Sequence, residues 1–119
     1  MAEIADQPTS PPGKPWPPPP DLHSVQELTA NADVEGFIAA GAPVDEYETE
    51  AEQLFKAIAT WSTEELTSVR LLPILEEIWA EAFSFDEAEV AKRRPALEKL
   101  AADIERFFGP GAQPQVRGA

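Results

Sequence analysis

Apolar residues recur at a spacing of three or four through most of residues 21–108, which is the period of an amphipathic helix. No segment alternates apolar and polar residues over the length of a strand, so the pattern argues against a sheet. The clearest stripe consists of Leu66, Val69, Leu72, Leu75, Trp79 and Phe83. The sequence therefore predicts an all-α fold, and its short connections favour an antiparallel four- to five-helix bundle.

Capping signatures mark the expected helix starts, because Ser, Thr or Asp followed three positions later by Glu satisfies free N–H groups of a first turn. The signature occurs at Ser24–Glu27, Asp45–Glu48, Ser62–Glu65 and Asp86–Glu89. Asp33 predicts the start of a further short helix that ends at Gly41. The second main helix places Tyr47, Leu54 and Ile58 on one face, and the last helix is expected to stop at Gly109-Pro110.

Two prolines fall inside predicted helices. Pro73 removes one backbone hydrogen bond from the central helix, so we expect a kink or two shorter helices there. Pro95 raises the same alternative of a split for the last helix.

Both ends of the chain differ in composition from the predicted helical domain. Eight of the thirteen prolines lie in residues 1–20, which predicts a proline-rich arm, either disordered or in the polyproline II conformation. Residues 21–108 form the predicted domain, and residues 109–119 a flexible tail. The chain has no cysteine, which excludes disulfides and thiolate zinc sites. The N-terminus lacks the basic and apolar regions of a signal peptide, so we expect a cytoplasmic protein.

Negative charge dominates the predicted domain. From Asp21 to Glu89 there are seventeen acidic residues and only Lys56 and Arg70 as cations. Nucleic acid and anionic membranes would be repelled, so we expect neither as a partner, whereas a protein with a basic surface is favoured. The cations of the last helix are expected to neutralise neighbouring acidic helices or to pair with a second copy in a homodimer.

The segment Asp33–Tyr47 reads Asp-Val-Glu-Gly-Phe-Ile-Ala-Ala-Gly-Ala-Pro-Val-Asp-Glu-Tyr. Its Gly41-Ala42-Pro43 turn, the following Asp45-Glu46-Tyr47 and Glu50 one turn later resemble the YugE-like family of small bacterial all-helical domains of unknown function. Two positions depart from that family's pattern, Val34 after Asp33 and Ser84 after Phe83. The resemblance implies a helical bundle over residues 22–108 and no particular activity.

An acidic face built from the second main helix and the start of the third suggests a function in protein binding. We expect a non-enzymatic module that engages a basic partner, in the manner of an immunity or antitoxin-like protein. The candidate partner-binding residues are Asp45, Glu46, Tyr47, Glu50, Glu64 and Glu65. Tyr47 has two interpretations, a buried phenol with a polar partner or an exposed contact residue.

Two other functions remain open. Trp16 and the four prolines after it resemble a ligand for proline-binding domains, so the arm of an adaptor or assembly subunit is one alternative. Glu46 with Glu50, and Glu48 with Glu52, form helical carboxylate pairs that suit a divalent cation. A carboxylate- or metal-dependent enzyme is the other alternative, but the sequence has no nucleophile motif or phosphate loop, so we expect no catalytic residue, metal site or cofactor.

Overall fold

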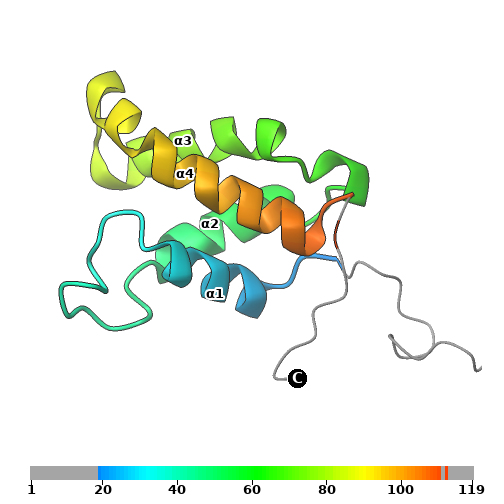
Figure 1. Ribbon diagram of the computed structural model, residues 1–119, viewed down its shortest axis with the longest axis horizontal. Helices are drawn as coiled ribbons and strands as arrows, with labels where there is room; N and C mark the ends of the chain where they lie inside the picture. The colour runs from blue at the N-terminus through cyan, green and yellow to red at the C-terminus, as the bar shows by residue number, and fades with distance from the viewer. Residues whose placement is uncertain (1–18, 111, 113–119) are drawn as a thin grey trace, which may run out of the picture.

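The computed structural model describes residues 19–110 and 112. The elements are α1 (Leu22–Ala32), α2 (Glu48–Ile58), a 3₁₀ turn η1 (Thr63–Glu65), α3 (Ser68–Phe83) and α4 (Glu87–Phe108). Helices and turns account for all the regular structure of the described residues, so the all-α prediction is confirmed (Figure 1). The predictions for Trp16 and most of the arm, and for most of residues 109–119, lie outside the described residues.

Each helix packs on the next one in sequence, and α1 also contacts α4, so the four helices enclose a shared core. Trp79 of α3 is completely buried and is the largest side chain in this core. The other fully or almost fully buried side chains include Val25, Leu54, Ile58, Leu66, Leu71, Leu75, Leu97, Leu100, Ile104 and Phe108. Most of the predicted apolar stripes therefore supply the core, but Val69 was wrongly assigned to it, since 81% of Val69 is exposed.

Helix α4 follows its sequence signals closely. The Asp86 carboxylate accepts a hydrogen bond from the Glu89 N–H at 2.9 Å, as predicted for an N-cap. The helix ends at Phe108, directly before Gly109. At Gly109 a Cβ atom would lie 2.4 Å from the Leu66 carbonyl oxygen, so glycine permits this close approach of two backbones.

Three predicted helix starts were wrong by a few residues. Asp21, and not Ser24, caps α1, because its carboxylate accepts the Ser24 N–H at 2.9 Å. Helix α2 begins at Glu48 and not directly after Asp45, whose backbone carbonyl accepts the Glu48 N–H in a turn. The Ser62–Glu65 box is present but caps only η1, so α3 starts later, at Ser68.

The predicted short helix from Asp33 to Gly41 was also wrong. Asp33 adopts a left-handed conformation with φ 45° and ends α1 instead of starting a helix. Gly36, with φ 76°, interrupts helical geometry again three residues later. Residues 33–47, here called the strap, form an irregular connection that extends beyond the adjoining ends of α1 and α2 (Figure 1).

Neither internal proline divides its helix. Pro73 lies within α3 and Pro95 within α4, so the alternatives in which either helix is split were wrong. A proline leaves the carbonyl four residues earlier without its helical partner. Those carbonyls belong to Val69 and Ala91, which are both exposed, so water can replace the missing N–H.

Candidate binding surface

The strap is closed around the phenol of Tyr47. Tyr47 donates a hydrogen bond to the Asp33 carboxylate at 2.7 Å and accepts one from the Glu35 N–H at 2.9 Å. Only 2% of Tyr47 is exposed, and its ring stacks between Phe37 and Trp79 at centroid distances of 5.9 and 6.2 Å. Of the two interpretations of Tyr47, the structure has the buried phenol with polar partners.

A buried ion pair anchors the strap to the rest of the fold. The Glu35 carboxylate accepts hydrogen bonds from Arg93 Nε and Nη2 at 3.0 Å and from the indole Nε1 of Trp79 at 3.0 Å. The Glu35 side chain is 6% exposed, and the Arg93 guanidinium also lies 4.0 Å from the Phe85 ring centroid and contacts Glu89. We call Glu35, Trp79 and Arg93 the latch.

Sequence reasoning did not identify the latch. Glu35 is 44 residues from Trp79 and 58 from Arg93, so no local pattern connects the three. The available signal was Glu35 itself, an acidic residue among the apolar residues Val34, Phe37 and Ile38. A segment that faces solvent would not require these apolar neighbours, so their presence indicates that the segment is buried and that Glu35 is paired.

The hydrogen-bonded pair of Tyr47 and Asp33 makes the stability of the fold sensitive to high pH. Burial, with the hydrogen bond to Asp33 as a second cause, raises the pKa of Tyr47 to about 12, and the same bond lowers the pKa of Asp33. A tyrosine in an unfolded chain titrates near a pKa of ~10. The contribution of Tyr47 to stability is therefore complete below pH ~10 and is lost as the pH rises through about 12.

We expect the urea midpoint of the protein to fall more steeply between pH ~10 and ~12 than that of a Tyr47→Phe variant. Tyr47 is the only tyrosine, so absorbance at alkaline pH reports its ionisation directly. Equal losses of stability in the two chains would show that the phenol does not cause the effect.

Most cations of the described residues are occupied by carboxylates of the same chain. Arg94 contacts Glu76 at 2.5 Å, which joins α4 to α3, and Arg70 contacts Glu65 at 3.5 Å. The other pairs are Lys92 with Glu89, Lys99 with Asp103 and Arg106 with Asp103. Within residues 19–110, Lys56 is the cation for which no ion pair is seen.

The predicted partner-binding residues do not form one surface. Asp45 and Glu46 lie exposed before the N-terminus of α2, whereas Glu64 and Glu65 follow its C-terminus. An 11-residue helix is ~16 Å long, so these two pairs are separated by the length of α2. Glu65 is occupied by the Ser62 N–H and Arg70, and Glu50 is only 8% exposed.

Three exposed carboxylates remain together at the start of α2. Asp45, Glu46 and Glu48 have no cationic partner among the described residues, and we call them the acidic lip. The strap holds the lip in place, because Tyr47 lies between its members and is fixed by Asp33 and Glu35.

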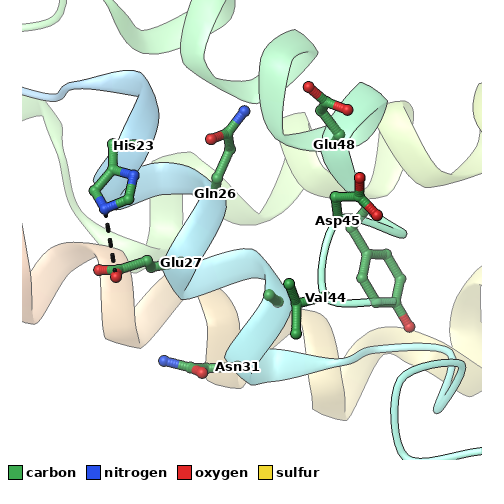
Figure 2. Close-up of a pocket in the computed structure, with 9 residues that line it drawn as sticks. His23, Gln26, Glu27, Asn31, Val44, Asp45 and Glu48 are labelled. Atoms are coloured by element: carbon green, nitrogen blue, oxygen red, sulfur yellow. Dashed lines mark ion pairs between the residues drawn. The ribbon is translucent and has the colours of Figure 1, made fainter. Parts of the chain in front are cut away.

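The lip borders a groove of about 390 Å³ between α1 and the start of α2. Figure 2 shows the α1 side chains His23, Gln26, Glu27 and Asn31 along one side and Val44, Asp45 and Glu48 along the other. Ala30 and Tyr47 complete the lining. His23 is the basic residue of the groove, and its Nε2 lies 3.5 Å from Glu27.

No protein-family model, curated protein or solved structure matches this chain significantly. The YugE-like resemblance therefore stays a prediction. Among the described residues, no group of three or more His, Asp or Glu side chains is arranged to hold a metal ion. None of the described helices has the length and apolar character needed to cross a membrane.

Proposed function

We propose that this protein is a non-enzymatic, cytoplasmic binding module whose acidic lip engages a basic surface of another protein. The observation that supports this proposal is that cations of the fold are paired with carboxylates, whereas the carboxylates of the lip have no cation. Arg93 and Arg94 are bonded to carboxylates within the fold, while Asp45, Glu46 and Glu48 are exposed without a cation. The proposal includes an antiparallel arrangement of the four helices, which contact one another in sequence order.

Unpaired surface carboxylates favour association because they attract a cationic partner over several ångströms before contact. The chain carries a formal charge of −13 at pH 7, so its overall field adds to that of the lip. Such steering raises the association rate more than the final affinity, and salt screens it over a Debye length of ~8 to 10 Å. An immunity or antitoxin-like protein that covers the cationic cleft of a toxin is one form of this function.

A fixed strap supports this role. An exposed loop normally loses conformational freedom when it binds, which reduces affinity. Here Tyr47 and Glu35 already hold the lip through hydrogen bonds to Asp33, Trp79 and Arg93. The lip is therefore preorganised, and less entropy is lost on association.

Affinity capture from a lysate of the source organism tests the proposal. The bait is the full chain, a lip variant carrying Asp45→Asn, Glu46→Gln and Glu48→Gln, or a control carrying Glu77→Gln, Glu81→Gln and Glu98→Gln. All six carboxylates are exposed, and both variants lose the same charge. We expect a basic protein on the full chain and the control at low salt, and its loss from the lip variant and at high salt.

Two results would contradict the proposal. Equal capture by the lip variant and the control would mean that overall charge, and not the lip, attracts the partner. A partner retained by the lip variant but lost on deletion of residues 1–20 would instead support an adaptor that binds through its arm.

A further inference from the structure

The groove beside the lip combines an apolar floor with an acidic rim. Ala30 and Val44 contribute apolar surface, and Val44 is 76% exposed, whereas Tyr47 lines the groove but is only 2% exposed. Glu27 lines the α1 side, while Asp45 and Glu48 line the opposite side (Figure 2). Its volume of about 390 Å³ falls in the range of ~300 to 1,000 Å³ typical of ligand pockets, which are usually apolar with a few placed polar groups.

Charge complementarity identifies the occupant. The rim offers three carboxylates, and no Lys or Arg is among the lining residues. Glu27 contacts His23, whereas Asp45 and Glu48 have no cationic partner in the described part of the chain. An anionic or purely apolar ligand would leave these carboxylates partly desolvated and unpaired.

We infer that the groove takes a short extended segment of the basic partner, in which Lys or Arg alternates with aliphatic residues. Alternate side chains of an extended chain point to opposite faces, so aliphatic groups contact Val44 and Ala30 while cations reach the rim. From His23 to Asn31 helix α1 rises ~12 Å, which equals about four residues of extended chain. This inference rests on the proposed function and adds the binding site and the form of the partner.

An NMR titration tests the inference directly. The ¹⁵N-labelled full chain is titrated at low salt with the acetylated, amidated pentapeptide Lys-Leu-Arg-Leu-Lys, and Glu-Leu-Glu-Leu-Glu serves as the control peptide. We expect saturable amide shifts in residues 26–31 and 44–48, with a Kd of about 1 mM or tighter, and none with the acidic peptide. Added salt should weaken binding.

Matched variants separate the groove from general charge. Asp45→Asn with Glu48→Gln should weaken peptide binding roughly fivefold, since each exposed ion pair contributes modestly. Glu77→Gln with Glu81→Gln, which removes the same charge from α3, should leave the Kd unchanged. Val44→Ser should also weaken binding, because it removes apolar contact and no charge.

Three outcomes would overturn the inference. These are an absence of saturable shifts, equal shifts around acidic residues outside the groove, and shifts at the groove that depend on protein concentration without peptide. The last outcome would place a second copy of the chain in the groove. None of these outcomes would contradict the proposed function, because the affinity-capture experiment tests the lip without the pentapeptide.

Discussion

Replacing Arg93 by alanine is expected to lower the free energy of unfolding by about 3 kcal/mol. The substitution leaves the Glu35 carboxylate, whose side chain is 6% exposed, without its cation and with Trp79 as its one remaining side-chain donor. A buried charge deprived of its partner loses far more than an exposed one. The strap would detach from α4 and carry the lip with it.

Urea denaturation followed by circular dichroism measures this effect. Arg94→Ala is the matched control, because its ion pair with Glu76 is partly exposed to water and is expected to contribute much less to stability than the pair of Arg93 with Glu35. In a Glu35→Gln background, Arg93→Ala should cost at least ~1 kcal/mol less, since a neutral amide is left behind. Equal losses for Arg93→Ala and Arg94→Ala would contradict the account of the latch.

Replacing Trp79 by alanine is expected to destabilise the protein by about 4 kcal/mol. Trp79 is fully buried, stacks on Tyr47 and is tilted against Phe83, so the substitution opens a large cavity under the strap. It also removes the indole N–H that bonds to Glu35 at 3.0 Å. Packing and polar contributions therefore act in the same direction.

Two further variants separate these contributions. Trp79→Phe keeps most of the apolar volume but removes the N–H, so a loss of ~1 to 2 kcal/mol is expected. Trp61→Ala should cost clearly less than Trp79→Ala, because Trp61 is partly exposed and lies at the edge of the core. Thermal unfolding compares all three, and equal losses for the two alanine variants would contradict a central role of Trp79.

The parts of the fold that were predictable depend on neighbours in sequence. Asp86 caps α4 through the N–H of Glu89, and Leu54 and Ile58 share a buried face at helical spacing. The prediction of a buried apolar stripe was wrong at Val69, because helical periodicity does not show whether another element packs against a given turn of the helix. Because α3 begins at Ser68, Val69 lies in the first turn of this helix, where it is exposed.

The strap could not be predicted because distant side chains decide its conformation. Asp33 has the sequence context of an N-cap, but the Tyr47 hydroxyl and the N–H groups of Ile38 and Ala39 use its carboxylate in a different turn. A tertiary hydrogen bond thus overrides a weak local preference. Long ordered connections of this kind are uncommon in small domains and often carry function.

The candidate site was predictable only in part. The acidic character of Asp45, Glu46 and Glu48 follows from the sequence, and helical spacing already placed Tyr47 on the face of Leu54. The groove required the position of α1 beside α2, which no local signal gives. Glu64 is separated from the lip because the whole length of α2 lies between them.

The most direct test of the acidic lip is the dissociation constant of the captured partner, measured at two salt concentrations for three chains. These are the full chain, the lip variant (Asp45→Asn, Glu46→Gln, Glu48→Gln) and the control variant (Glu77→Gln, Glu81→Gln, Glu98→Gln). We predict that the full chain and the control bind alike and weaken together as salt increases, while the lip variant binds at least ~tenfold more weakly at low salt and responds less to salt. Identical affinities and identical salt dependence for the lip and control variants would contradict the central claim.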